Sequence, residues 1–148
     1  MEEEFMMVAF KEAEKAFKKG EIPIGACVVK DGKVLAKAHN NREKSQNALN
    51  HAEMICIRAA CKKLRSWRLD GCTLFVTLEP CPMCAGACLN ARISKVVFGA
   101  NESRSGFFGS VFDVSCKNIL NHNIEVKSGV MQSECGDLVR KFFFERRK

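Results

Sequence analysis

Apolar side chains recur at steps of three and four residues in two long stretches, the spacing that places them on one face of a helix. The first stretch spans residues 2–19 and is closed by Gly20, a residue typical of helix ends. The second covers about residues 51–65. Two further helices are predicted. One begins at Pro82, because proline suits the first helical position, and the other covers residues 134–147.

Shorter runs of apolar and β-branched residues predict strands between these helices. They lie at residues 26–29, 34–36, 72–78, 95–98 and 124–127. Asp31-Gly32 separates the first two runs and indicates a tight hairpin. The polar segments 39–50 and 101–118 are predicted to be loops. Since helices connect the later strands, we expect a largely parallel sheet led by an antiparallel pair, with helices on both faces.

Composition narrows the class of protein. The chain has 148 residues, of which 47% are apolar and 28% charged, so we expect residues 1–148 to form a single α/β domain. The 24 Lys and Arg exceed the 17 Asp and Glu by seven, which favours a polyanionic partner. No apolar run reaches the roughly 18 residues of a membrane helix, and the N-terminus lacks the basic region of a signal peptide. We therefore expect a cytoplasmic protein with no membrane partner.

Nine cysteines are the unusual feature of the composition. An odd number without a signal peptide indicates reduced thiols. Most of them fall in predicted helices and strands, where a thiol acts as a small buried hydrophobe. Cys116 falls in the predicted loop and is ambiguous.

Two short motifs together predict a metal site. Cys81 and Cys84 are three residues apart at the start of a predicted helix, so both sulfurs can face one point, and the helix N-terminus favours thiolates. His51 opens the preceding helix and would add a nitrogen ligand. One nitrogen and two sulfurs suit zinc, and three protein ligands leave a fourth position open for water. Glu53 could then take a proton from that water.

Other interpretations of these residues remain open. Asn50 could cap the second helix, with Glu53 as the capping-box carboxylate. A lone Cys-x-x-Cys also occurs in redox pairs, although such a pair has no use for His51 and Glu53. Cys88 follows Cys84 by four residues and could be a fourth ligand, which would close the site to water.

With these motifs in place, the sequence resembles the zinc-dependent nucleobase deaminases, and within them the tRNA-specific adenosine deaminases of bacteria. The likeness runs from about Phe5 to Arg147, and its most specific parts are the segments 20–26, 51–53 and 76–87. The resemblance implies a cytidine-deaminase-like three-layer α/β/α sandwich with a five-stranded mixed sheet. It also implies one Zn²⁺ per subunit, a homodimer, and deamination of adenosine to inosine at the wobble position of a tRNA anticodon.

By position, the resemblance makes His51, Cys81 and Cys84 the zinc ligands and Glu53 the catalytic proton carrier. It assigns substrate binding to Asn40, whose amide both donates and accepts hydrogen bonds, and to Ala52.

Weaker expectations concern the RNA surface. The basic, aromatic C-terminal segment suits single-stranded RNA, with cations for phosphates and rings for bases. The candidate contacts are Glu102, Phe142, Phe143 and Arg146. The chain departs from the family at residues 47–50, Glu102 and Phe107-Phe108, which affects the loops rather than the metal ligands.

Two rival functions remain. One is deamination of a free base or nucleotide, such as guanine or cytosine, with the same zinc site. The other is a non-catalytic zinc module that binds nucleic acid, which predicts a fourth protein ligand.

Overall fold

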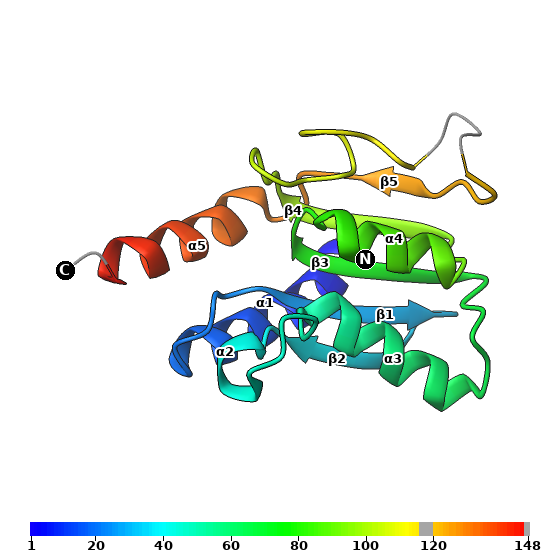
Figure 1. Ribbon diagram of the computed structural model, residues 1–148, viewed down its shortest axis with the longest axis horizontal. Helices are drawn as coiled ribbons and strands as arrows, with labels where there is room; N and C mark the ends of the chain where they lie inside the picture. Colours follow the sequence, from blue (N-terminus) through cyan, green and yellow to red (C-terminus); the bar gives the residue numbers. More distant parts are fainter. Residues whose placement is uncertain (116–119, 147–148) are drawn as a thin grey trace.

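The computed structural model describes residues 1–115 and 120–146, which fold around one five-stranded sheet (Figure 1). The helices are α1 (Glu2–Lys18), α2 (Arg42–Ser45), α3 (Ala52–Leu64), α4 (Pro82–Asn90) and α5 (Gln132–Arg146). The strands are β1 (Gly25–Lys30), β2 (Lys33–His39), β3 (Cys72–Leu78), β4 (Lys95–Ala100) and β5 (Glu125–Lys127). The predicted loop position Cys116 lies outside the described residues.

The sheet has the strand order β2-β1-β3-β4-β5. Strand β1 pairs antiparallel with both β2 and β3, whereas β3, β4 and β5 are parallel. The mixed sheet and its leading antiparallel hairpin are therefore confirmed. At the hairpin, Asp31 and Gly32 both have positive φ, as a tight turn requires.

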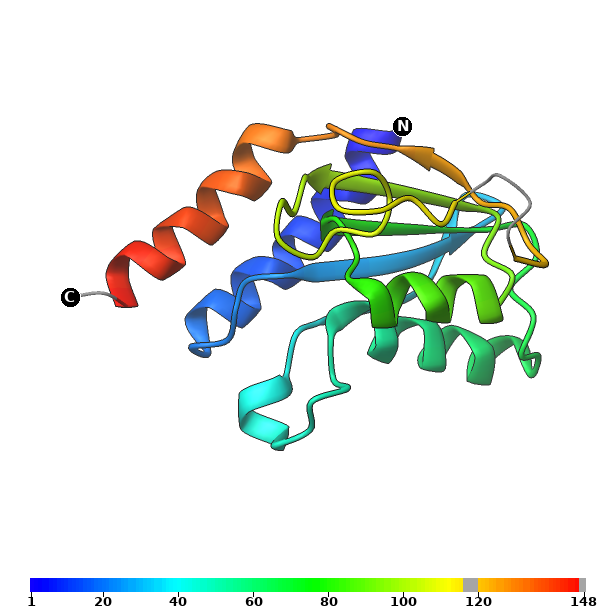
Figure 2. The ribbon, with the colours of Figure 1, turned by 45° about the horizontal axis from the view of Figure 1, so that its top comes forward.

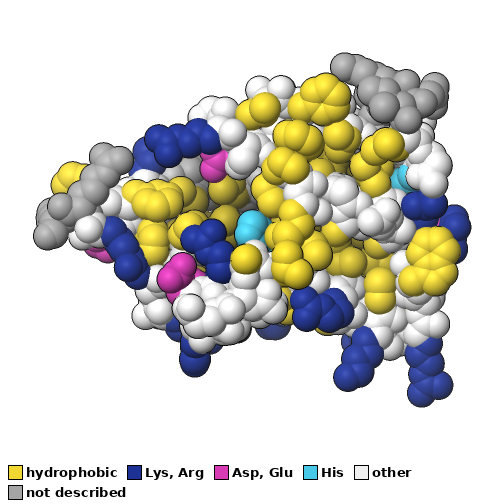
Figure 3. All heavy atoms as spheres, in the orientation of Figure 1, with side chains coloured by type: hydrophobic (Ala, Val, Ile, Leu, Met, Phe, Trp, Pro, Cys, Tyr) yellow, Lys and Arg dark blue, Asp and Glu magenta, His cyan; other side chains and the backbone are white. Residues whose placement is uncertain are grey.

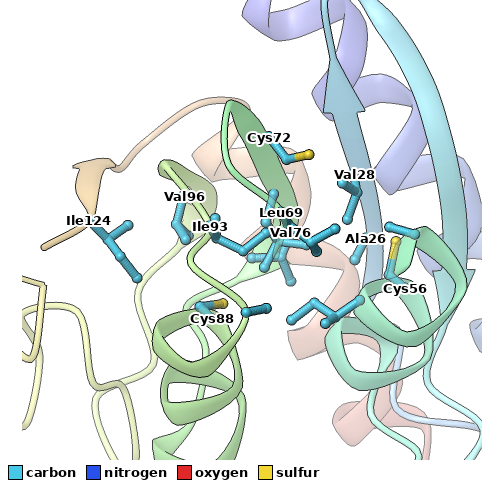
Figure 4. Packing of buried hydrophobic residues seen from close by; sticks show 14 of the residues in the cluster. Ala26, Val28, Cys56, Leu69, Cys72, Val76, Cys88, Ile93, Val96 and Ile124 are labelled. Atoms are coloured by element: carbon cyan, nitrogen blue, oxygen red, sulfur yellow. The ribbon is translucent and has the colours of Figure 1, made fainter. Parts of the chain in front are cut away.

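Alternation of side chains along the strands builds two apolar layers. Val28, Leu74 and Val96 face α3 and α4, where Cys56 and Cys88 complete the packing (Figure 4). The intervening strand residues face the other side and pack with α1 and the start of α5. These are Cys27, Val29, Phe75 and Val97, and Ala100 at the end of β4 joins the same cluster. Figure 2 shows the sheet between the two helix layers. The three-layer α/β/α sandwich is thus confirmed.

Helix α2 lies inside the segment predicted to be a loop, so that prediction was wrong for residues 42–45. A distant side chain explains this short helix. The buried carboxylate of Glu21 accepts hydrogen bonds from the backbone N–H groups of Glu43 (3.1 Å) and Lys44 (2.7 Å), which are otherwise unpaired at a helix start. A local sequence pattern cannot show this contact.

Helices α3 and α4 run side by side beneath the sheet with their N-termini at the same end (Figures 1 and 2). Strand β3 ends at Leu78 and leads directly into α4, so the chain returns to this end just before Cys81. The topology thereby brings the two predicted metal-binding motifs together. Among the described residues, no helix has the length and apolar character that a membrane crossing requires.

Candidate active site

The two cysteine ligands are placed by the start of α4. Cys81 is the N-cap residue in an extended conformation, and Pro82 is the first helical residue, as predicted. Cys84 lies within the first turn and is buried, whereas Cys81 is partly exposed. A turn that begins at proline thus presents both sulfurs on one side of the helix end.

His51 brings the third ligand from the neighbouring helix. It is the N-cap residue of α3, with extended backbone and no side-chain capping bond. Its Nδ1 lies 3.7 Å from the sulfur of Cys81 and 3.6 Å from that of Cys84. All three ligand atoms lie within 4.8 Å of one another, so the group could hold a metal ion.

These separations fit tetrahedral zinc. Bonds of about 2.0–2.1 Å to nitrogen and about 2.3 Å to sulfur put those two atoms about 3.5 Å apart at the tetrahedral angle. A hydrogen bond from the Cys84 thiol, together with one from His51, lowers the pKa of Cys81 to about 4, so this sulfur is a thiolate, the form a metal binds. Within the described residues, Cys88 is not part of the ligand group and packs in the core instead, so the four-ligand alternative is wrong.

Glu53 is the second residue of α3, lies beside this group and is only 4% exposed. In the described part of the chain, its buried Oε1 has no hydrogen-bond partner. Burial raises the pKa of the Glu53 carboxyl to about 7. A buried acceptor without a partner is costly unless a ligand or water completes it, so Glu53 fits a proton-transfer role beside a bound metal and water.

The capping-box interpretation of this helix start is wrong, because His51 rather than Asn50 occupies the N-cap position. Asn50 instead directly precedes the candidate ligand His51. Its Nδ2 donates to the Ser45 hydroxyl at 3.0 Å, while its buried Oδ1 has no partner among the described residues. The sequence patterns did not predict this unsatisfied acceptor.

The predicted substrate ligand Asn40 follows β2 directly and is 5% exposed. Its Nδ2 donates to the Ile22 carbonyl at 3.3 Å, and its Oδ1 accepts from the Arg42 N–H at 3.2 Å. Each end of the amide therefore keeps capacity for one more hydrogen bond. Ala52, the other predicted substrate contact, is fully buried in the first turn of α3, between a metal ligand and Glu53.

Two neighbouring phenylalanines of the C-terminal helix α5 have different surroundings. Phe142 is buried and packs edge-on against Phe17 of α1, and the guanidinium of Arg146 covers the Phe142 ring at 4.7 Å. Arg146 also donates to the Gly20 carbonyl, which ties α5 to the end of α1. Phe143, by contrast, is 44% exposed.

A cavity of about 520 Å³ separates α5 from the loop after β4. It is lined by Glu102, Arg104, Val139, Arg140, Phe143 and Phe144. Figure 3 shows apolar side chains gathered along α5 between lysine and arginine side chains. Two of the weakly predicted contacts, Glu102 and Phe143, therefore face the same cavity.

Comparison with known proteins defines the class. A family model of MafB19-like deaminases matches residues 1–147, which agrees with the sandwich fold and the His-Cys-Cys group. The chain is 51% identical to a tRNA-specific adenosine deaminase of Bacillus subtilis over 147 residues, covering 99% of this chain and 91% of the relative. The chain belongs to the family of tRNA-specific adenosine deaminases.

Solved structures agree. The chain superposes with a TM-score of 0.88 and 38% identity on a structure from a study of A-to-I editing by tRNA:A34 deaminases, covering 91% of this chain and 98% of that one. A guanine deaminase of Bacillus subtilis is 42% identical with a TM-score of 0.64, covering 67% of this chain and 64% of that one. The likeness to the tRNA-editing structure thus extends over nearly the whole chain, whereas the likeness to the guanine deaminase covers about two thirds.

Proposed function

We propose that residues 1–148 form one zinc-dependent deaminase domain that converts adenosine to inosine at the wobble position of a tRNA anticodon. The observation that carries this proposal is the convergence of His51, Cys81 and Cys84 beside the buried carboxylate of Glu53, whose Oε1 has no hydrogen-bond partner among the described residues. One Zn²⁺ per subunit would be held by the three ligands, leaving a position for water. When bound, zinc supplies an activated water, because it lowers the pKa of water from about 15.7 to roughly 7.

The chain's own residues then carry the proton and hold the base. Oε1 of Glu53 accepts a proton from the attacking water and delivers it to the adenine ring nitrogen. As the water oxygen bonds to C6, Glu53 takes the second proton from that oxygen and passes it to the amino nitrogen. The bond from C6 to nitrogen then breaks, so ammonia leaves and inosine remains. The free capacity of the Asn40 amide suits a purine edge, which presents both donors and acceptors. Ala52 would line the base pocket between these groups.

The RNA would approach across the cavity beside α5. A wobble adenosine is unpaired in an anticodon loop, so turning it into the site costs only a few kcal/mol. The exposed ring of Phe143 and the cations Arg104 and Arg140 suit the neighbouring bases and phosphates. Phe142 and Arg146 support this surface by docking α5 on α1, and Glu102 closes the opposite wall.

The test is inosine formation in an anticodon stem-loop that carries a wobble adenosine. We expect the zinc-loaded protein to form inosine, and we expect a zinc chelator or Glu53→Gln to abolish the reaction. Glu14→Gln is the matched control, because Glu14 is an exposed glutamate on α1. It should retain full activity.

Parallel reactions with free guanine, cytosine and cytidine distinguish the rival functions. Deamination of a free base with no inosine in the stem-loop would overturn the tRNA assignment while leaving the metal site intact. RNA binding without any deamination would favour the non-catalytic zinc module.

We further propose that the protein works as a homodimer in the cytoplasm. Exposed apolar side chains in the described part of the loop before β5 support self-association. These are Val111, Phe112 and Leu120, each about half exposed. A monomeric mass in light scattering at the concentration of the activity assay would contradict the dimer.

A further inference from the structure

Glu79 is a buried carboxylate that the proposed mechanism does not use. It follows β3 and stands two residues before the metal ligand Cys81. Only 2% of the residue is exposed. Every hydrogen bond that it accepts in the described structure comes from the loop after β4. The donors are the N–H groups of Glu102 (3.1 Å), Phe108 (3.0 Å) and Ser110 (3.1 Å), the hydroxyl of Ser110 and the amide of Asn101 (3.5 Å).

The loop is closely fitted around this carboxylate. A Cβ on Gly106 would lie 2.5 Å from Oε2 of Glu79, and closer still to Cδ and Oε1, so any larger residue there must displace the carboxylate. The loop is also attached to the next residue, since the Phe107 N–H donates to the Pro80 carbonyl at 3.0 Å. The backbone of residues 102–110 is thus fixed to the segment that leads directly into Cys81.

The same loop reaches the other part of the proposed substrate surface. Glu102 and Arg104 form the wall of the cavity that faces Phe143 on α5. The Glu102 N–H is held by Glu79, and the Glu102 carboxylate in turn accepts from the Arg104 N–H at 3.0 Å. The contacts therefore run without a break from Glu79 to the cavity wall.

We propose that Glu79 is a positioning residue for RNA, which holds the 102–110 loop in the conformation that completes the binding surface between the metal centre and α5. This inference rests on the proposed function, because it assumes that RNA crosses that surface. Glu79 does not touch the substrate. Glu79 orders the loop before RNA binds. The conformational entropy of the loop is therefore not lost on binding, and the affinity for RNA is higher.

Replacing Glu79 by glutamine tests this inference, because the substitution exchanges one carboxylate oxygen for an NH₂ group of similar size. An ionised carboxylate is an acceptor at both oxygens, which matches a site in which all partners are donors. In Glu79→Gln one oxygen becomes an NH₂ group, which must face either the N–H groups of Phe108 and Ser110 or that of Glu102. The NH₂ group and the backbone N–H groups that it faces are then all donors without an acceptor, so part of the hydrogen bonding that holds the loop is lost.

We expect Glu79→Gln to raise KM for the anticodon stem-loop about tenfold while kcat changes less than about twofold. Zinc content, measured by atomic emission, should stay at the wild-type value. Amide hydrogen exchange should accelerate either at Phe108 and Ser110 or at Glu102, because the N–H groups that face the new NH₂ group lose their acceptor. A purely structural role would instead reduce the amount of folded enzyme, and hence kcat, at constant KM.

Gly106→Ala provides an independent test that leaves Glu79 in place. Its added methyl group displaces the carboxylate, so it should raise KM in the same way. Gly86→Ala is the matched control, because a Cβ at Gly86 meets nothing within 4 Å. In a double variant the effects of Glu79→Gln and Gly106→Ala should be less than additive, because both act on one contact.

The outcomes separate this inference from the proposed function. Wild-type protein that fails to deaminate the stem-loop overturns the proposed function. Wild-type activity with an unchanged KM in Glu79→Gln or Gly106→Ala, or exchange unchanged at all three of Glu102, Phe108 and Ser110 in Glu79→Gln, overturns the positioning role. Loss of zinc from either folded variant would also overturn it, since Glu79 would then act on the metal ligands instead.

Discussion

Gly25, the first residue of β1, marks the closest approach of α1 to the sheet. A Cβ at this position would lie 2.5 Å from the backbone nitrogen of Ala13, 2.9 Å from Cβ of Glu12 and closer still to the carbonyl oxygen of Ala9. Two of these three obstacles are helix backbone, which cannot rotate away as a side chain can. We therefore predict that Gly25→Ala is strongly destabilising, although it adds only one methyl group.

The size of the effect follows from these separations. Restoring an ordinary contact of 3.4 Å to the Ala13 nitrogen alone requires α1 to move outward by about 0.9 Å, and the closer carbonyl oxygen of Ala9 requires a larger movement. The helix is packed by Met6, Ala9, Ala13 and Ala16, all fully buried, so this movement opens the apolar layer beneath it. Overpacking a core usually costs about 1–3 kcal/mol, and a backbone obstacle belongs at the upper end, near 3 kcal/mol.

Urea unfolding followed by circular dichroism measures this loss. Gly86→Ala is again the matched control, because it adds the same methyl group to an unobstructed helical position. There the free energy of unfolding should rise by up to about 1 kcal/mol, as the higher helix propensity of alanine predicts. A loss below about 1 kcal/mol in Gly25→Ala would show that α1 can be displaced at little cost, and the reasoning would be wrong.

Three further predictions concern the metal, the buried carboxylate of Glu12 and the RNA surface. Zinc present at 100 times its Kd adds about 2.7 kcal/mol to the free energy of unfolding, so removing it should lower Tm by about 5–10 °C. An unchanged Tm after complete removal would contradict the metal site. Burial opposes ionisation of Glu12, but hydrogen bonds with Lys15 and His39 outweigh it and hold the pKa of Glu12 below its usual 4.5. The stability that this carboxylate adds is therefore present above pH 4.5 and is lost as the pH falls through the lowered pKa. Glu12→Gln should cost about 1–3 kcal/mol at pH 7 and nothing in strong acid, and a loss that persists in acid would refute this. Phe143→Ala should weaken stem-loop binding by about 1–3 kcal/mol while Phe143→Tyr preserves it, and equal binding by both would exclude stacking on this ring.

The elements that the sequence predicted well are those whose pattern is local. Each of three patterns depends on one short segment alone: the helical spacing of residues 2–19, the apolar run at 95–98 and the turn signal Asp31-Gly32. The structure confirms the helix, the strand and the turn that they predict. Helix α2 has no such pattern, because its start is held by Glu21, more than twenty residues away.

The candidate site likewise combines features that a local sequence pattern predicts with features that depend on tertiary packing. Cys81 and Cys84 are three positions apart, so one helical turn is enough to predict that their sulfurs converge. The fit of His51 to them, and the absence of Cys88 from the group, depend on how α3 packs against α4. Glu79 could not be found in advance, because its partners lie 22 to 31 residues further along the chain.

Hydrogen-bond partners, rather than burial, distinguish Glu53 from the other buried glutamates. Four glutamates are buried in the described chain, and all of them lie at the ends or on the inner faces of core elements. Glu12 binds Lys15 and His39, and the carboxylates of Glu21 and Glu79 are satisfied by backbone N–H groups of loops that they hold in place. Glu53 alone leaves a buried oxygen without a partner, and that oxygen lies beside the His-Cys-Cys group. A folded chain tolerates such an acceptor where a substrate, water or metal completes it, and this supports the proposed proton-carrying role of Glu53.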